Sequence, residues 1–428
     1  MNLGNAGYVE ALLDEKKKEG LNPNLIAEEI LAKAQIVYLN DNFYQYRDGV
    51  YKKSSQQEID LLIKLEVGES FRSFLAKEVR NSLSTIATKK PEDFDQDPDI
   101  LNCKNGLLKL STLQLEPHRP DYLSLSQISA SFFEGTPECP KWIRFLREIL
   151  VDEELKANIL QEFLGYSLTP SCRMEKALFL IGSGANGKSV FLDVLDGIFG
   201  TENKSSVGLD QLKNSHYTAR LFGKMLNASY ESETKAEVYE GQLKALISGE
   251  EVEADHKFGH PFQFRNKAKF IFALNSLPRV NDKTDAFYRR LLIVPFNVTI
   301  PEETRNINLA KEILSEERDQ IFKWSLYGLA RLRDQGFTKS KQVEEAISEY
   351  RVSNNNVLVF VNERCQLSPA LQVRKSTLYE DYKDFCGESG YEALGEIKFG
   401  KQIREQFRQV TDDRITDGVR IWKGIDKK

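Results

Sequence analysis

The sequence predicts an α/β protein with a parallel central sheet and mainly helical regions before and after it. Between about residues 171 and 300, short apolar runs such as KALFLIG and LLIVPFNVTI alternate with segments of helical spacing. This alternation is typical of a parallel sheet that is covered by helices. With 428 residues, 41% of them hydrophobic, the chain is long enough for several domains with buried cores.

The region before residue 99 is expected to be mainly helical, because VEALLDEKKK and LIAEEILAKAQIV carry apolar residues three and four positions apart. A strand-like stretch, FYQYRDGVYKK, interrupts the helices around a turn at Asp48 and Gly49. An acidic stretch with two prolines at 91–100 predicts a solvated loop, and Asn105-Gly106 then predicts a hairpin. We expect a domain boundary near this loop.

The tail of the chain is expected to form a winged-helix-like domain. After helices between about 303 and 365, the helix candidates STLYEDYKDFCGES and FGKQIREQFRQV precede two strand-like segments, DRITDG and VRIWKGI. Residues 371–428 hold 12 Lys or Arg against 11 Asp or Glu, so this domain is not strongly basic. Lys401, Arg404 and Arg408 lie about one helical turn apart, which fits a DNA contact and a protein-docking surface equally well.

Composition narrows the class of protein. The formal charge of -5 and the pI near 5.7 give no overall attraction to nucleic acid, so any such contact depends on local basic surface. The five cysteines are scattered without a C-x-x-C pair, which argues against a disulfide framework or a zinc site. Without a membrane-spanning apolar run or a signal-peptide core, the expected location is cytoplasmic, with no membrane partner.

The stretch GSGANGKS predicts a phosphate-binding loop. It stands between the apolar run KALFLIG and the helical SVFLDVLDGIFG, the strand-loop-helix context in which this motif binds nucleotides. The glycines let backbone N–H groups face the phosphates, the lysine neutralises the β and γ phosphates, and the serine hydroxyl can bind Mg²⁺. ATP and Mg²⁺ are therefore the expected cofactors. The expected nucleotide-binding residues are Gly182, Ser183, Gly184, Ala185, Asn186, Gly187, Lys188 and Ser189.

ATP hydrolysis also needs carboxylates at the end of a neighbouring strand. In LFGKMLNASYESE the segment KMLNASY is the expected strand, and two glutamates follow it. Glu231 is the expected Mg²⁺ ligand and Glu233 the expected base. The alternative is a solvated acidic turn, because polar Asn227 and Ser229 weaken the strand pattern.

Two further positions complete the expected catalytic set. The strand in KAKFIFALNSLP ends at Asn275, whose amide is a candidate to hold the γ-phosphate or the attacking water; a turn former is the plainer reading. Arg289 and Arg290 precede the strand LLIVPF. Either is a candidate to stabilise transition-state charge from the next subunit, with a surface salt bridge as the alternative.

The turn HKFGH carries two histidines four positions apart. Gly259 and Pro261 argue against one helix face, and no third ligand is nearby, so a metal site is disfavoured. Lys257 and Phe258, with His256 beside them, suit backbone contact and base stacking on single-stranded DNA. A solvated hairpin is the alternative.

At these residues the sequence resembles superfamily 3 helicases of the AAA+ class, in particular the phage and plasmid primase-helicase family related to poxvirus primase-helicases. The similarity runs from ILNCKNGLLKL through GSGANGKS, LFGKMLNASYESE, LKALISGEEVEADHKFG and FALNSLP to FYRRLLIVPF. It places the family's acidic motif on Glu231 and Glu233, its sensor amide on Asn275 and its arginine finger on Arg289 or Arg290. Its channel hairpin falls on the segment around Lys257.

The resemblance also divides the chain. It implies a mainly helical N-terminal region (1–99), a family N-terminal domain with a helical collar (100–170) and an AAA+ P-loop core (171–300). A helical segment (301–368) and a winged-helix-like domain (369–428) follow. The family often has Gly-Gly-Asp where this chain has Ser-Gly-Glu at 248–250, and a basic residue in place of the aspartate that precedes HKFGH.

The function that the resemblance implies is an ATP-dependent DNA helicase for replication of a phage, plasmid or other mobile element. A hexameric ring would move 3′ to 5′ on single-stranded or forked DNA, and a primase or polymerase is a further expected partner. Fewer than 100 residues precede the similar segment, so priming activity is not expected. The alternative is a P-loop ATPase that loads or remodels a protein partner without unwinding DNA. A small-molecule kinase is disfavoured, since the arginine pair comes late and large helical regions surround the core.

Overall fold

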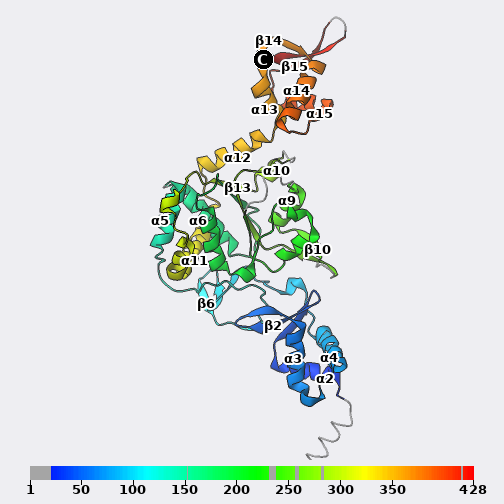
Figure 1. Cartoon of the computed structure of the whole chain (residues 1–428), viewed down its shortest axis with the longest axis vertical. Coiled ribbons are helices and arrows are strands. Elements are labelled where there is room, and N and C mark those ends of the chain that lie inside the picture. The colour runs from blue at the N-terminus through cyan, green and yellow to red at the C-terminus, as the bar shows by residue number, and fades with distance from the viewer. Residues whose placement is uncertain (1–20, 152, 231–237, 256–259, 281–283, 416–417) are drawn as a thin grey trace, which may run out of the picture.

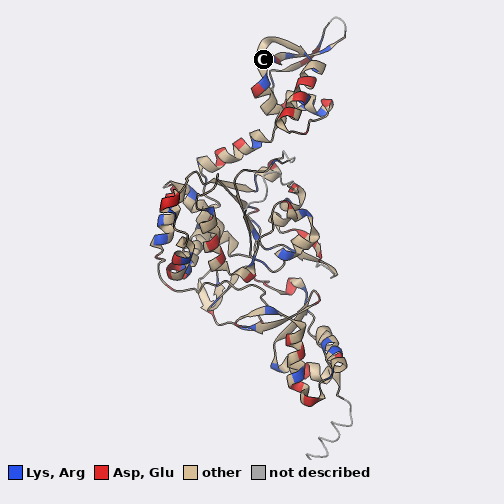
Figure 2. Cartoon of the chain, in the orientation of Figure 1, with Lys and Arg blue, Asp and Glu red and all other residues tan. Residues whose placement is uncertain are grey.

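The computed structural model describes residues 21–151, 153–230, 238–255, 260–280, 284–415 and 418–428. Figure 1 shows an elongated molecule with an N-terminal unit at one end, a parallel-sheet core in the middle and a C-terminal unit at the other end. Figure 2 shows acidic and basic residues interspersed along the helices of all three parts, as the small net charge suggests. Within the described ranges, none of the helices combines the length and apolar character that crossing a bilayer requires.

The N-terminal unit packs three helices against one face of a small sheet. Its elements are α2 (Pro23–Lys33), β1 (Ile36–Leu39), β2 (Asn42–Arg47), β3 (Val50–Ser54), α3 (Gln56–Val67) and α4 (Ser73–Ile86). The turn between β2 and β3 uses Asp48 and Gly49, both with positive φ, as the sequence predicts. The helix expected over LIAEEILAKAQIV is too long, because its last residues form β1 and Ile36 pairs with Gln45.

A second small sheet joins this unit to the core. It consists of β4 (Ile100–Cys103), β5 (Gly106–Lys109) and β6 (Gln114–Glu116) in antiparallel order, which confirms the predicted hairpin at Asn105-Gly106. The helices α5 (Pro140–Leu150) and α6 (Glu154–Ser167) follow. Leu101 and Leu108 share a hydrophobic cluster with these helices and with the core sheet, so residues 100–167 pack on the core.

The core sheet has five parallel strands in the order β13-β7-β12-β9-β8. The strands are β7 (Ala177–Ile181), β8 (Lys204–Ser205), β9 (Leu226–Tyr230), β12 (Lys269–Leu274) and β13 (Leu291–Pro295). The expected strand in KMLNASY is therefore present. Its polar Asn227 is buried because its side chain bonds both backbone groups of Val207, accepting at 2.8 Å and donating at 2.9 Å.

Helices cover both faces of this sheet (Figure 1). Strand residues alternate between two hydrophobic clusters: Leu178 and Leu180 face one, Ala177 and Phe179 the other. The first cluster includes α5, α6, α7 (Lys188–Phe199) and the long α11 (Leu309–Gln335). The second includes α9 (Glu240–Ser248), α10 (Asp285–Tyr288) and the hairpin strands β10 (Glu251–Asp255) and β11 (Pro261–Arg265), with the short α8 (Ser215–Thr218) nearby. The predicted parallel sheet covered by helices is confirmed.

The C-terminal unit joins the core through α12 (Lys341–Ser353). Its elements are α13 (Asn356–Arg364), β14 (Cys365–Arg374), α14 (Lys375–Ser389), α15 (Glu396–Gln406), β15 (Thr411–Arg414) and β16 (Arg420–Lys427). The two helices and the hairpin strands appear where the sequence predicts them. The sequence missed β14, which pairs with β16, because most of its residues are exposed and its apolar residues do not alternate. The unit's core contains Val357 and Phe360 of α13, so packing begins before residue 369.

Candidate functional site

The loop between β7 and α7 has a backbone that glycine alone accommodates well. A Cβ atom on Gly182 would lie 2.1 Å from the Asn186 amide nitrogen and 2.4 Å from the Phe296 backbone oxygen. Gly187 has a φ of 86°, and a Cβ atom there would lie 2.6 Å from the Ile149 side chain of α5. Close approach therefore requires glycine at both positions, and the positive φ of Gly187 favours glycine there as well.

The segment after β13 is hydrogen-bonded to the phosphate loop and to the end of β7. The Phe296 N–H donates to the Ile181 oxygen at 2.7 Å, and the Ile300 N–H donates to the Ala185 oxygen at 2.7 Å. The Asn186 amide, 3% exposed, donates to the Phe296 oxygen at 3.3 Å. The loop thus has a defined shape before any ligand binds.

Lys188 begins α7 and its side chain folds back under the loop. Its amine donates to the Gly182 backbone oxygen at 2.6 Å and to the Asn186 side-chain oxygen at 3.0 Å, and the residue is 8% exposed. Ser189, the next residue, is exposed. A helix N-terminus presents unbonded N–H groups and a partial positive charge, so cation, hydroxyl and helix end together form an anion site.

A cavity of about 1050 Å³ opens over this loop. Its lining includes every loop residue from Gly184 to Ser189, together with α5, the end of β12 and the segment 300–312. That volume is ample for a nucleotide beside the phosphate loop. The structure therefore places Lys188, Ser189 and the sensor candidate Asn275 around one space.

Sequence reasoning missed the positive charges on the far wall of this cavity. Lys141 and Arg144 of α5 line it, as does Arg305. Lys141 bonds Glu316, and this contact raises the pKa of the lysine. The spacing of Lys141 and Arg144 on one helix face was a usable signal, whereas Arg305 sits in an irregular stretch without one.

The acidic candidates follow β9. Tyr230, the last residue of that strand, lines the cavity, and its hydroxyl donates to the Asp193 carboxylate at 2.6 Å. Burial, reinforced by that carboxylate, raises the pKa of Tyr230. Glu231 and Glu233 lie outside the described residues. Among the residues that are described, no group of three or more His, Cys, Asp and Glu side chains is arranged to hold a metal ion.

Arg289 and Arg290 lie at the opposite end of the strands. Leu291 pairs with Ala177, at the start of β7, whereas the phosphate loop follows the end of β7. Arg290 is 8% exposed; its guanidinium donates to Ser248 at 2.9 Å and to the Ala286 oxygen at 2.6 Å, and pairs with Glu175 at 3.0 Å. The Arg289 side chain is 64% exposed and lies 3.4 Å from Glu175. Neither arginine lines its own chain's phosphate cavity.

The segment expected to form the channel hairpin contains the antiparallel pair β10 and β11, with Asp255 opposite Pro261, and its place in a channel stays a prediction. His256, Lys257 and Phe258 fall between these strands, outside the described residues. Where the family often has a basic residue, Asp255 pairs with the His216 ring at 2.8 Å. The pair joins α8 to the base of the hairpin.

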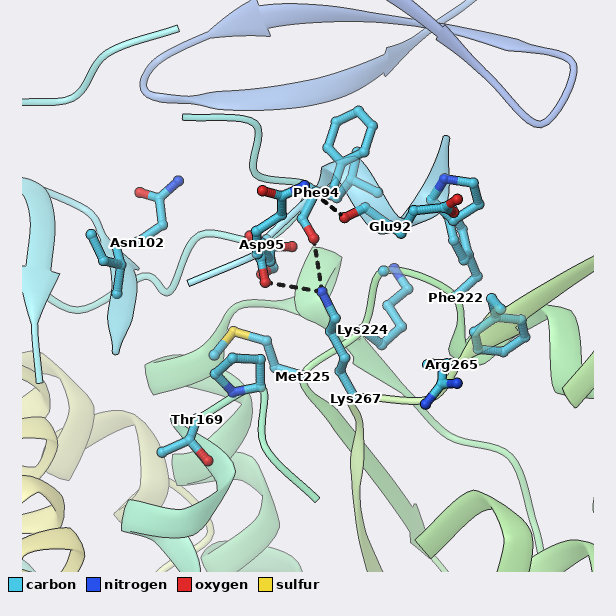
Figure 3. Close-up of a pocket in the computed structure, with 18 of the residues that line it drawn as sticks. Glu92, Phe94, Asp95, Asn102, Thr169, Phe222, Lys224, Met225, Arg265 and Lys267 are labelled. Carbon is cyan, nitrogen blue, oxygen red and sulfur yellow. Dashed lines mark hydrogen bonds between the residues drawn. The ribbon is translucent and has the colours of Figure 1, made fainter. Parts of the chain in front are cut away.

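A second cavity, of about 590 Å³, lies where residues 91–102 meet the core (Figure 3). The Lys267 amine crosses this junction and donates to the backbone oxygens of Phe94 and Asp95 at 2.8 and 3.1 Å. Lys224 bonds the Glu202 backbone oxygen. Burial lowers the pKa of both lysines. These amines hold separate chain segments together.

In the C-terminal unit, Lys401, Arg404 and Arg408 of the α15 region are all exposed. Two of the three have acidic partners, because Lys401 lies 3.7 Å from Glu405 and Arg404 lies 3.2 Å from Asp412. The basic face expected from the sequence is thus partly neutralised.

Three family descriptions match parts of the chain. The family of unknown function DUF5906 matches residues 180–290, which contain the phosphate loop. The description "D5 N terminal like" matches 26–151, and "RFX DNA-binding domain" matches 354–421.

Similar curated proteins come from invertebrate iridescent viruses and a mimivirus. "Putative helicase 184R" of Invertebrate iridescent virus 6 is 24% identical over 281 residues, covering 59% of this chain and 26% of that protein. "Putative helicase L207/L206" of Acanthamoeba polyphaga mimivirus is 29% identical over 166 residues, 36% of this chain and 16% of that protein. The chain therefore spans about a quarter or less of these relatives' length.

Among solved structures, the A form apo structure of the NrS-1 C-terminal region superimposes with a TM-score of 0.56 at 13% identity, covering 95% of this chain and 99% of that one. A second apo structure of that region gives 0.54 at 14% identity, with 95% and 100% covered. The matches support a phage or viral primase-helicase family. The family resemblance that the motifs predict is confirmed, and the structural likeness extends to nearly the whole fold.

Proposed function

We propose that this chain is an ATP-driven DNA helicase motor with an AAA+ superfamily 3 core, acting in replication of a phage, plasmid or other mobile element. Support comes from the phosphate loop on a five-stranded parallel sheet, in which β7 lies between the later strands β13 and β12. The D5-like and RFX-like matches and the helicase-named relatives point the same way.

The observation that carries the proposal is the preformed phosphate site. The Lys188 amine is held at the floor of the loop by two acceptors from that same loop, and the cavity beside it is large enough for a nucleotide. When phosphates enter, the ammonium gains charge-assisted contacts that outweigh its bonds to neutral oxygens. We assign ATP to this cavity, with the triphosphate on the loop and the nucleoside toward Arg144 and Arg305.

The residues present fit Mg²⁺. The exposed Ser189 hydroxyl borders the cavity at the first turn of α7, and hydroxyl, carboxylate and phosphate oxygens are the donors that Mg²⁺ prefers. Ser189 and Glu231 would hold the ion, which when bound neutralises charge on the β and γ phosphates. Glu233 would take the proton from the attacking water, and Asn275 would orient that water or the γ-phosphate.

We assign the arginine that acts between subunits to Arg289. Its guanidinium is exposed and lies at the edge of the sheet opposite the phosphate loop, a position that suits a neighbour's site in a ring. Arg290 is buried against Ser248, Ala286 and Glu175, an arrangement that suits support of the loop carrying Arg289. This choice makes an oligomer necessary for hydrolysis, and the family resemblance favours a hexamer that moves 3′ to 5′.

DNA would be contacted at two places. Lys257, with His256 and Phe258, belongs to the segment that links β10 to β11 in the sequence, and a lysine there would contact phosphates without reading sequence. The C-terminal unit, which contains α15, is the second candidate because of its RFX-like match. Single-stranded or forked DNA is the proposed substrate, and a primase or polymerase the proposed partner.

The test is ATP hydrolysis by the purified chain with and without forked DNA. The proposal expects hydrolysis that DNA stimulates several-fold, and loss of both in Lys188→Ala. Lys109→Ala, which removes an exposed lysine on β5 outside the cavity, is the matched control and keeps both. A rate of ATP hydrolysis that a protein partner raises and DNA does not would favour the loader function instead.

A further inference from the structure

The loop that follows the sensor candidate Asn275 contacts the C-terminal unit. Residues 276–280 leave the end of β12 at the nucleotide cavity and contact two helices that lie outside the core sheet. We infer that Arg279 couples nucleotide binding at the cavity to the position of the C-terminal unit. This inference rests on the proposed function, because it needs nucleotide beside Asn275.

The first contact is between Arg279 and the end of α14. The guanidinium donates to the backbone oxygens of Ser389, at 2.8 Å, and of Gly390, and lies 4.2 Å over the Tyr391 ring. The last carbonyls of a helix lack intrahelical partners and carry partial negative charge, so a cation there is bound by charge and by hydrogen bonds together. One side chain thus ties the core to α14.

The second contact runs through the backbone on either side of Arg279. The Tyr350 hydroxyl of α12 donates to the Pro278 oxygen at 2.6 Å, and the Val280 N–H donates to the Asn354 side chain at 2.9 Å. Tyr350 and Asn354 are 5% and 6% exposed, so these bonds are shielded from water. The backbone around Arg279 is therefore held firmly while its side chain reaches α14.

The other end of the segment is fixed to the phosphate loop. The Gly182 N–H donates to the Leu274 oxygen at 3.2 Å, and β12 is buried along its whole length. Only three residues separate Asn275 from Arg279, and one of them, Pro278, has a restricted φ. If a γ-phosphate displaces Asn275, the short and restrained loop therefore transmits most of that movement to Arg279.

The consequence is that the bound nucleotide shifts the position of the C-terminal unit relative to the core. This is the unit that matches the RFX DNA-binding description. Arg279 acts as a positioning residue, since it does not line the nucleotide cavity. Coupling between two sites of this kind amounts to a change of roughly 5- to 150-fold in the equilibrium that both sites share.

Hydrogen–deuterium exchange of the full chain, with and without Mg²⁺ and the non-hydrolysable analogue AMP-PNP, tests the coupling. The reporter is the peptide 384–394, whose Gly390 and Tyr391 amides both bond the Cys386 oxygen. In the wild type the analogue should change exchange there by about fivefold or more. Arg279→Ala should lose that nucleotide-dependent change, and Arg279→Lys should keep part of it.

The matched control is Arg364→Ala. Arg364 bonds Glu388 at 2.6 Å, on the same helix end, but joins α13 to α14 within the C-terminal unit. This variant should keep the nucleotide-dependent change. An unchanged response in Arg279→Ala, or a wild-type response at peptide 182–189 with none at 384–394, would overturn the coupling. No response at 182–189 itself would overturn the nucleotide site, and the coupling with it.

Discussion

Two lysines, the buried Lys188 and the half-buried Lys267, donate to backbone oxygens and yet belong to different kinds of site. Two acceptors of the Lys188 amine, the Gly182 backbone oxygen and the Asn186 side-chain oxygen, lie six and two positions away, within its own loop. The acceptors of Lys267 lie 172 and 173 positions away, on a segment of another unit. An amine held by its own loop can exchange its acceptors for a ligand at little cost to the fold, whereas one that joins distant segments cannot. The position of the acceptor in the chain therefore separates a ligand cation from a structural one.

The arginine pair repeats this contrast. Arg290 joins Glu175, Ser248 and Ala286, which come from three different segments, and is almost fully buried. The Arg289 side chain, mostly exposed, touches Glu175 at 3.4 Å. Surface ion pairs of this kind contribute little to stability, so the exposed arginine is available to a neighbour.

The largest expected effect comes from Lys188→Ala. ATP hydrolysis should fall by about 100-fold or more, because the charge on the β and γ phosphates is no longer neutralised. The melting temperature should stay within about 2 °C of wild type, since the Asn186 side chain, one of the two acceptors set free, lines a cavity that water can fill. A folded variant with normal turnover would contradict the site.

Arg289→Ala should lower hydrolysis by roughly 100- to 1000-fold without affecting the melting temperature. Mixing it with Lys188→Ala should restore part of the activity, because at some interfaces one subunit supplies the loop and the other the arginine. Size-exclusion chromatography of the mixture checks that mixed oligomers form. Mixed oligomers without any recovered hydrolysis would contradict a shared site.

Lys267→Met should do the reverse and leave ATP hydrolysis intact. Two hydrogen bonds from a charged donor are lost at a partly buried junction, a cost of about 2 kcal/mol that should lower the melting temperature by a few degrees. Differential scanning calorimetry measures this loss. If Lys267→Met lowered the rate of ATP hydrolysis and left the melting temperature unchanged, the contrast between the two lysines would be wrong.

The smallest effect is on the pH dependence of stability. Burial lowers the pKa of Lys267 below 10.5 in the folded state, so above that lowered pKa the unfolded chain binds the extra proton. Its contribution to stability is complete above pH 10.5 and is lost as the pH falls through the lowered value. The stability difference between wild type and Lys267→Met should therefore grow as the pH rises toward 10.5, which urea titrations at pH 7.5 and 10 can measure. A constant difference would contradict the lowered pKa of the Lys267 amine.

Sequence patterns predicted the parallel sheet and the phosphate loop because both depend on local signals. The run ALFLI and the loop GSGANGKS are contiguous in the sequence. Each glycine of the loop is required by a close approach or a positive φ at its own position. The hairpin turns at Asp48-Gly49 and Asn105-Gly106 were equally local. The expected helix was extended wrongly over β1 because Ile36 and Val37 continue the helical spacing of apolar residues. Their strand partners come from β2, which this local pattern does not reveal.

What the patterns missed depends on distant parts of the chain. Arg144 and Arg305 meet at the cavity only because α5 and the segment 300–312 fold over the phosphate loop. The difference between Arg289 and Arg290 follows from their burial, which adjacent positions in a sequence do not reveal. The roles of Glu231, Glu233 and Lys257 stay predictions, since these residues lie outside the described residues.

The most direct test of the central claim is strand displacement on a fluorescently labelled forked duplex. The wild-type chain should release the labelled strand with ATP and Mg²⁺, and should fail to do so with AMP-PNP. Lys188→Ala should release nothing, whereas Lys109→Ala should match the wild type. ATP hydrolysis by the wild type without release of the strand, on forks with either single-stranded tail, would contradict a helicase and leave a P-loop ATPase that acts on a protein partner.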